Sequence, residues 1–496
     1  MSAPAALADL EDLIDASGIA PRIEARLPIG VRHRQLRVRT LLAGMLLSQA
    51  DHRPAHLTRV RDALIALPPA DQVRPGVLED WKTGPHQLTC RQTERTFGLV
   101  TDALAKDQPG GTPSQILARI CDDLLEASIP SGYKQASSAL AVDWSDVETF
   151  SRPPPHGTSD CADPEASWGH RSGGGPGQDS ELFYGYFLPA GTMTREEHGP
   201  PIPELARRMT VSSCHADPAR ALVPVLTAMP GDGIPLGGIL DDSGCAHRDA
   251  EAWAIPLRQA GAQLIQDLHP SDRGPKGTCH GAVIANGNLY CPVTPRPLLE
   301  LGLLARDATP EETAAHDTRT AELARCKLGR ITSDDEDGYH RVMCPAAAGK
   351  IRCPLRPASM TLNRQRPEIL TPPDCCHQQT LTVPPDVAAK TRQKHDYPSK
   401  EHRRSYARRT GAERTFSTAK DPASNNIARG WCRLMGLTPL MLWLACLLAV
   451  RNQRILTAWD ARQDDDARRA AAGLPPRTRR RRRKTLASLA ATTAPP

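Results

Sequence analysis

Residues 406–420 read YARRTGAERTFSTAK. A helix turns by about 100° per residue, so Tyr406, Arg409, Glu413 and Lys420 fall on one narrow face of a predicted helix. Packing does not require four polar side chains in one stripe. The stripe indicates a site for an anionic substrate, in which the cations hold phosphate and the carboxylate holds a metal ion. The alternative is a surface helix in which Glu413 pairs with Arg409, an interaction that contributes little.

The chain before this stretch has the pattern of alternating strands and helices. Three strands, a helix and a strand are predicted in turn, and a further helix and strand follow. Their residue ranges are 137–150, 183–194, 207–214, 219–229, 236–244, 249–261 and 262–269. The apolar runs of the first and fourth strands end in aspartates.

Those aspartates and Glu413 are candidate metal ligands. Mg²⁺ prefers oxygen donors, and two-metal phosphoryl transfer needs carboxylates that converge on ions about 3.5–4 Å apart. Asp143 and Asp242 could supply such carboxylates together with Glu413. Their neighbours Asp146 and Asp241 remain alternatives, since each could instead be the ligand or could be a solvated strand end.

The spacing of the four residues on the helix face carries a family resemblance. Tyrosine, arginine, glutamate and lysine separated by two, three and six residues match the signature of a large group of bacterial insertion-sequence transposases. The chain resembles these DDE transposases over about residues 137–455. Asp242-Ser243-Gly244-Cys245 also matches the family motif around the second acid, except that Cys245 replaces an aromatic residue.

The resemblance implies a DNA transposase that cleaves insertion-sequence ends and transfers the strands to target DNA. Asp143, Asp242 and Glu413 would be the catalytic residues and would bind two Mg²⁺ or Mn²⁺ ions. Tyr406, Arg409 and Lys420 would contact double-stranded DNA, and we expect the same of the flanking Arg408 and Arg414. Such enzymes work as homodimers on paired ends. A metal-dependent nuclease on the same core and an inactive DNA-binding relic of a transposase are the alternatives.

The resemblance also implies the fold, which is α/β with an RNase H-like mixed-sheet core. We expect a helical N-terminal domain at 1–130, a catalytic core at 137–268 and 400–455, a cysteine-rich and β-rich insertion at 269–399, and a disordered basic tail at 456–496. The N-terminal domain could bind DNA through arginines near its start, although a solvated helix face would look the same. These arginines are Arg22, Arg26, Arg32, Arg34, Arg37 and Arg39.

Charge and hydropathy point to an intracellular protein that meets an anionic polymer. The net charge is +6, but residues 390–420 hold ten Lys and Arg against three acids, and 477–484 read RTRRRRRK. The start of the chain is acidic and lacks the pattern of a signal peptide, so we expect a cytoplasmic protein, on the nucleoid when bound to DNA. The apolar run 434–450 is slightly short for a membrane span, and we predict a buried core helix with no membrane partner.

The 14 cysteines are expected to be reduced thiols or metal ligands in such a compartment. Cys344, Cys353, Cys375 and Cys376 could hold one structural Zn²⁺, although their spacing is looser than that of a compact zinc motif. Buried reduced thiols are the alternative. The histidines near the catalytic segment are predicted to be ordinary loop residues with satisfied hydrogen bonds, and these are His215, His247 and His269.

Overall fold

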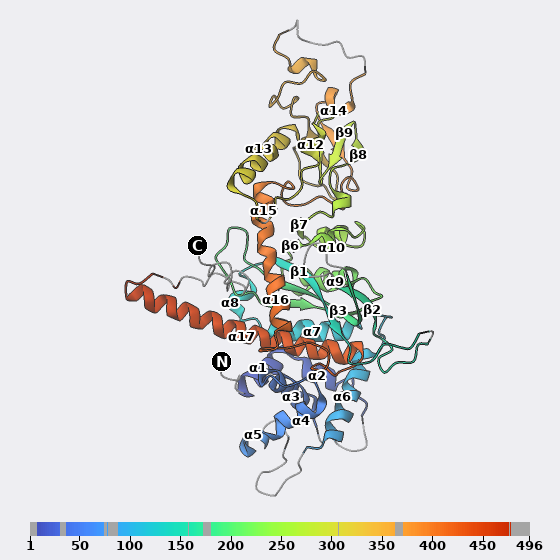
Figure 1. The fold of residues 1–496 in the computed structure, drawn as a ribbon, viewed down its shortest axis with the longest axis vertical. Coiled ribbons are helices and arrows are strands. Elements are labelled where there is room, and N and C mark those ends of the chain that lie inside the picture. The colour runs from blue at the N-terminus through green and yellow to red at the C-terminus, as the bar shows by residue number, and fades with distance from the viewer. Residues whose placement is uncertain are drawn as a thin grey trace, which may run out of the picture.

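The computed structural model is elongated, with three stacked parts (Figure 1). It describes residues 7–29, 36–73, 77, 88–156, 158–171, 180–305, 307–362, 371–475 and 477. N-terminal helices lie at one end, the main sheet lies in the middle, and the insertion lies at the other end. The fold is therefore a mixed α/β fold, as predicted.

The main sheet has seven strands in the order β2-β3-β1-β6-β7, with β4 and β5 also paired to β3. The bounds are β1 Leu140–Glu148, β2 Ser167–Arg171, β3 Glu181–Met193, β4 Ala206–Met209, β5 Ser212–Ser213, β6 Gly238–Asp241 and β7 Gln263–Gln266. β1, β2, β4 and β5 run antiparallel to β3, whereas β1, β6 and β7 are parallel. All five predicted strands are present, and the short polar β2 was not predicted.

Alternation along β1 decides which side chains face which layer, because successive strand residues point to opposite faces. Leu140 and Val142 join the apolar cluster under α9 and α11, whereas Val147 joins the cluster on the other face with Phe416. Asp143 shares the odd-numbered face with Val147. The helices on the first face are α9 Pro218–Thr227, η1 Met229–Asp232, α10 Ser243–Ala246 and α11 Ala254–Gln259.

The predicted N-terminal helical region is confirmed within the described residues. It contains α1 Leu7–Ser17, α2 Ile19–Glu24, α3 Val38–Ala50, α4 Leu57–Ile65, α5 Pro69–Val73, α6 Cys90–Ala105, α7 Gln115–Ala127 and α8 Ser131–Lys134. Two of the arginines considered for DNA binding are engaged within the region, since Arg22 pairs with Asp123 and Arg39 pairs with Glu11 and Asp15. Arg32 and Arg34 lie outside the described residues.

A single long helix, α17 Leu437–Ala471, joins the N-terminal helices to the sheet. Its residues from Leu437 to Asn452 are nearly all buried, and they share one apolar cluster with α1, α3, α6, α7 and β3. The helix is long and apolar enough to meet a membrane-span criterion, but 72% of its apolar window is buried inside the protein. The prediction of a buried core helix at 434–450 is confirmed.

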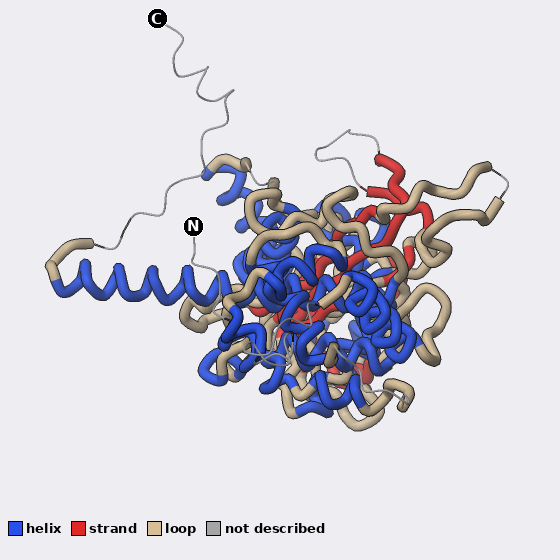
Figure 2. Tube along the Cα trace, turned by 90° about the horizontal axis from the view of Figure 1, so that it is seen from below, coloured by secondary structure: helices blue, strands red, loops and turns tan. Residues whose placement is uncertain are grey.

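The prediction that the chain is disordered from residue 456 is wrong for its first part. α17 continues to Ala471 and projects away from the body (Figure 2). Alanine, arginine and glutamine in this segment favour a helix even without an apolar stripe, which explains why periodicity missed it. Most of the basic run 477–484 lies outside the described residues, and Arg477 itself pairs with Asp465 at 2.9 Å.

The insertion between β7 and α15 is less β-rich than predicted. It holds two three-stranded antiparallel sheets and several helices. The strands are β8 Pro275–Cys279, β9 Ala282–Ala285, β10 Asn288–Tyr290, β11 Gly329–Arg330, β12 His340–Met343 and β13 Leu381–Val383, and the helices are η2 Pro270–Asp272, α12 Arg296–Leu299, α13 Pro310–Cys326, η3 Pro357–Ser359 and α14 Asp374–His377. The 17-residue α13 buries only Leu323, so it lacks an apolar stripe, but Thr309 and Glu312 form a capping box that could have revealed it.

The pairing of β1 with β3 requires glycine at position 185, and this requirement can be tested. A Cβ there would collide with the carbonyl oxygen of Val147, and backbone cannot move aside as a side chain can. We expect Gly185→Ala to lower the free energy of unfolding by about 1–3 kcal/mol. Gly191→Ala in the same strand is the matched control, because its Cβ would meet no atom closer than 3.4 Å. Equal melting temperatures for the two variants would contradict this close approach of β1 and β3.

Candidate functional site

The stretch 406–420 is helical, as predicted, but in three parts. α15 Lys400–Tyr406 is followed by the 3₁₀ turn η5 Ala407–Arg409 and by α16 Thr410–Lys420. The side chain of Ser399 caps α15, and Oγ1 of Thr415 lies 2.9 Å from Oγ1 of Thr192 on β3. Phe416 is buried in the core. These tertiary contacts compensate for the weak helix propensity of Gly411.

All three predicted metal ligands meet at Arg409. Its Nη2 donates to Oδ2 of Asp143 and to Oδ2 of Asp242, each at 3.0 Å, and its Nη1 donates to Oε1 of Glu413 at 3.0 Å. The Arg409 side chain is 13% exposed and that of Glu413 is 48% exposed, so the acid cluster opens to solvent on the Glu413 side. We call Asp143, Asp242, Glu413 and Arg409 the acid cluster.

The structure distinguishes Asp242 from its neighbour Asp241. Asp241 is fully buried and accepts hydrogen bonds from Nε1 of Trp253 at 2.5 Å and Nε2 of Gln266 at 3.0 Å. Burial raises its pKa well above the ordinary value, partly opposed by those two hydrogen bonds. Asp241 therefore ties β6 to β7 and α11, and Asp242 is the residue that reaches the acid cluster.

Asp146 also lies outside the acid cluster. Its Oδ1 accepts a 2.7 Å hydrogen bond from Nζ of Lys420, and its Oδ2 is 3.5 Å from Nη2 of Arg171. Asp143 does not end its strand as predicted, because β1 continues to Glu148. Parallel pairing with β6 stops at Ala141, however, so Asp143 stands where the two strands separate.

The structure gives a steric reason why residue 244 is a glycine. Asp242 is the N-cap of α10, and its Oδ1 accepts from the backbone N–H of Gly244 at 2.9 Å. A Cβ at residue 244 would lie 2.7 Å from the Trp144 ring and 3.0 Å from that oxygen. Cys245, which stands where an aromatic residue was expected, is fully buried in the cluster under α9 and α11.

The electrostatics of the acid cluster favour a bound cation. Burial and then the charge of Asp242 raise the pKa of Asp143 to about 6, although Arg409 opposes this rise. Burial alone would lower the pKa of Arg409, but Tyr406 and the three acids outweigh it and hold that pKa above its ordinary value. One guanidinium thus faces three carboxylates.

The remaining basic residues of the helix differ in accessibility. Lys420 and Arg414 are exposed and pair with Asp146 and Glu204 respectively. Arg408 is buried and donates to the carbonyl oxygens of Ser405 and Arg195. Arg408 is therefore held by backbone carbonyl oxygens, although it also lines the groove described below, and its DNA contact stays a prediction.

Tyr406 is mostly buried, with its ring stacked on His402 at a centroid distance of 5.8 Å. It packs on the small apolar cluster of Ala139, Leu240 and Ile265. Burial raises its pKa, and Arg409 partly opposes this effect. Tyr406 therefore supports the strand ends beneath the acid cluster.

A basic groove lies between α16, α17 and the segment that leads from β3 to β4. It has a volume of about 600 Å³. Five arginines other than Arg408 line it, together with Trp459 and Glu204, and they are Arg195, Arg404, Arg414, Arg451 and Arg462. Such a concentration of guanidinium groups suits the phosphates of a nucleic-acid backbone.

The cysteines of the insertion lie in two adjoining clusters, but their thiols are too far apart to coordinate one zinc ion as they stand. Cys344 and Cys353 share a small buried cluster with Cys291, and the Sγ atoms of Cys375 and Cys376 lie 3.8 Å apart in the adjoining cluster. Among the described residues, no three of these thiols come within 4.8 Å of one another. Burial raises the pKa of Cys376 to about 12, which favours the neutral thiol. Structural zinc at Cys344, Cys353, Cys375 and Cys376 stays a prediction.

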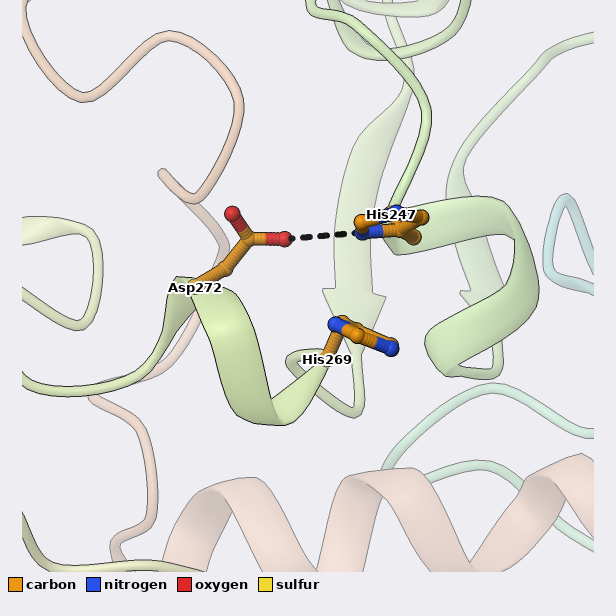
Figure 3. Close-up of side chains that lie close together, drawn as sticks. All are labelled: His247, His269 and Asp272. Atoms are coloured by element: carbon orange, nitrogen blue, oxygen red, sulfur yellow. Dashed lines mark ion pairs between the residues drawn. The ribbon is translucent and has the colours of Figure 1, made fainter.

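Two histidines that were predicted to be isolated loop residues are in fact neighbours. The rings of His247 and His269 lie 4.1 Å apart, and Nδ1 of His247 is 3.6 Å from Oδ2 of Asp272 (Figure 3). His247 follows α10 and His269 follows β7, so both come after adjacent parallel strands, whose carboxyl ends share one sheet edge. This shared position after adjacent strands is the feature of the sequence that could have predicted the closeness of the two histidines. His215, in contrast, is a loop histidine bonded to Ser213 and Ser167, as predicted.

Comparisons of the chain with models of protein families, with curated proteins and with solved structures give no match.

The raised pKa of Asp143 predicts a pH-dependent effect of its removal. Because this pKa is higher in the folded than in the unfolded chain, the charge of Asp143 destabilises the fold increasingly between about pH 4 and pH 6 and fully above that range. Asp143→Asn should therefore raise the free energy of unfolding by about 1–3 kcal/mol at about pH 8 and by much less at about pH 4.

Urea unfolding of the metal-free protein at both pH values measures this difference. Asp146→Asn is the matched control on the same strand, and we expect no gain from it because it only loses the ion pairs with Lys420 and Arg171. A gain from Asp143→Asn that is the same at both pH values would argue against the raised pKa.

Proposed function

We propose that this chain is a DDE transposase of the insertion-sequence type, with an RNase H-like catalytic core. The observation that carries the proposal is the meeting of Asp143, Asp242 and Glu413 at one guanidinium. These acids come from two adjacent parallel strands and a helix that returns after an insertion. The same three acids and Arg409 are the residues that the transposase resemblance requires.

The strand order supports an RNase H-like core. The first strand, β1, is central, and β3 and then β4 and β5 follow it in antiparallel pairing. α9 then leads to β6 and a second helix to β7, both parallel to β1 on its other side. This arrangement agrees with the expected order of the family.

The acid cluster fits divalent metal of the Mg²⁺ type. Its donors are carboxylate oxygens only, the ligands that Mg²⁺ and Mn²⁺ prefer, and their charge exceeds that of Arg409. Asp143, Asp242 and Glu413 would hold the ions, which would activate the attacking hydroxyl and stabilise the leaving oxygen. In this proposal Arg409 leaves its position between the acids and binds a DNA phosphate.

The basic surfaces supply the DNA contacts of the proposal. Lys420 is exposed on the helix face of Glu413, and Arg414 is exposed in the basic groove along α16. Double-stranded DNA, as transposon end and as target, is the proposed partner. A homodimer on paired ends and a cytoplasmic location belong to the proposal as implications of the family.

Glu413→Gln tests the proposed chemistry. We expect Mg²⁺-dependent cleavage of the element's terminal inverted repeats to fall at least about a thousandfold, because a carboxylate ligand is lost while the side chain keeps its size. Binding of the same DNA should change less than about threefold. Glu401→Gln, on the exposed face of α15, is the matched control and should retain full activity.

The products of the unmodified protein decide between the candidate activities. Cleaved ends together with strands joined to target DNA support the transposase, whereas cleaved ends without joined products indicate the nuclease. Absence of both, with DNA binding retained, indicates the inactive relic. Full cleavage by Glu413→Gln would refute the role of Glu413 as a ligand.

Arg409→Ala tests whether the guanidinium occupies a place that metal can take. Without Arg409 the three carboxylates repel one another, and the variant should lose about 2–4 kcal/mol of stability in the absence of metal. Millimolar Mg²⁺ should then raise the melting temperature of Arg409→Ala more than that of the unmodified chain. Arg414→Ala is the control, since its partner Glu204 lies outside the acid cluster. An equal Mg²⁺ effect on all three proteins would contradict this prediction.

A further inference from the structure

His247, His269 and Asp272 place three potential metal donors together. One ligand atom from each lies within 4.8 Å of the others, and the centroids of the two imidazole rings are 4.1 Å apart, with the rings tilted by 38° (Figure 3). In a tetrahedral zinc site the ligands lie about 2.0–2.2 Å from the ion and hence about 3.3 Å from one another. His247 is 49% exposed, so a small rotation of its side chain can close the remaining distance.

The carboxylate of this trio is already oriented by a second group. Oδ2 of Asp272 is buried, receives no well-aligned hydrogen bond from the described residues, and lies 2.8 Å from Nζ of Lys390. Carboxylates that bind metal commonly interact with a further polar group behind them, which fixes their direction. Lys390 can keep this position while the other lone pairs of Asp272 bind the ion.

The ring of His269 is held in a similar way. Its Nδ1 lies 2.6 Å from Oγ of Ser271 and 3.2 Å from the backbone nitrogen of the same residue. Without a metal, Nδ1 accepts the N–H of Ser271, which leaves the proton of a neutral ring on Nε2. An ion bound at Nε2 would move that proton to Nδ1, which would then donate to Oγ of Ser271. Hydrogen bonding at the nitrogen opposite the ligand atom is the usual arrangement for metal-binding histidines.

We propose that His247, His269 and Asp272 form a binding site for a borderline transition metal ion, with Zn²⁺ as the best fit. Two imidazoles and one carboxylate suit Zn²⁺ and neighbouring first-row ions, whereas the all-carboxylate acid cluster suits Mg²⁺. The two sites share no residue. They are connected through α10, which has Asp242 at its N-cap and His247 at its C-cap.

The proposed ion would join α10 to the turn η2. His247 is the C-cap of α10, His269 is the N-cap of η2, and Asp272 is the last residue of η2, where the insertion begins. An ion bound by all three would fix the short α10 and with it the backbone of Asp242. This inference needs no assumption about the reaction of the acid cluster.

Co²⁺ serves as the spectroscopic probe, because it replaces Zn²⁺ and absorbs visible light. The full-length chain is first stripped with chelator and then titrated with Co²⁺ in the presence of excess Mg²⁺. We expect one equivalent to bind with the spectrum of nitrogen and oxygen ligands. His247→Ala and His269→Ala should each weaken this binding at least about tenfold, and Cys375→Ser should leave it unchanged. Thiolate charge-transfer bands would report any separate cysteine site.

His215→Ala is the matched control, because His215 is a loop histidine outside the trio. Circular dichroism and the melting temperature of the metal-free variants show whether each still folds, and His247→Gln replaces His247→Ala if that variant does not. Unchanged Co²⁺ stoichiometry and affinity in the His247 and His269 variants would overturn the proposal. So would the absence of any nitrogen-and-oxygen Co²⁺ spectrum in the unmodified chain. Because no DNA is present, loss of the transposase proposal would leave this result unaffected.

Discussion

The guanidinium of Arg409 is the point at which the separate parts of the core meet. β1 and β6 each bring an aspartate to it, and α16 brings Glu413 from the same helix face. Three carboxylates would repel one another at this distance without a cation. The side chain of Arg409 therefore does two things: it holds α16 over the sheet, and it offsets part of the negative charge of the site. The surplus negative charge leaves room for a further cation.

The chain returns from the insertion to the sheet through a set of contacts at β7. The backbone N–H of Lys394 donates to the carbonyl oxygen of Leu264, and the side chain of Gln393 accepts from the N–H of Gln266. His402 then bonds to the carbonyl oxygen of Gln266 at 2.9 Å, and burial lowers its pKa to about 4, so its ring is neutral and Nε2–H donates. The insertion thus starts and ends at β7, and α15 begins from a fixed point.

The sequence was sufficient where one periodicity governed a segment. The strand that contains Asp143, the strand that precedes Asp242, the helix face with Arg409 and Glu413, and the buried helix at 434–450 all followed from local pattern. Choosing between Asp241 and Asp242 depended on a motif, and only the structure supplies the physical reason, which is that Trp253 and Gln266 donate hydrogen bonds to Asp241.

The features that were missed depend on weak patterns or on contacts distant in sequence. α13 and the second half of α17 expose most faces, so neither has an apolar stripe. The burial of Arg408 depends on the carbonyl oxygen of Arg195, more than 200 residues earlier, which its position among basic neighbours does not reveal. The pairing of His247 with His269 required the parallel alignment of β6 and β7, which spacing alone does not give.

α17 has a consequence for how the chain is made. The N-terminal helices bury their apolar faces against Leu437–Val450, which the ribosome adds more than 300 residues after α7 is complete. Until then the apolar residues of α3 and α7 lack their final partner, so the nascent chain carries incompletely covered helices through most of its synthesis. Contacts of such sequence separation slow folding and favour binding by chaperones. The first part of the protein therefore completes its packing only when nearly the last part has been made. A chain interrupted before residue 437 would contain Asp143, Asp242 and Glu413 but would lack the helix that completes the core.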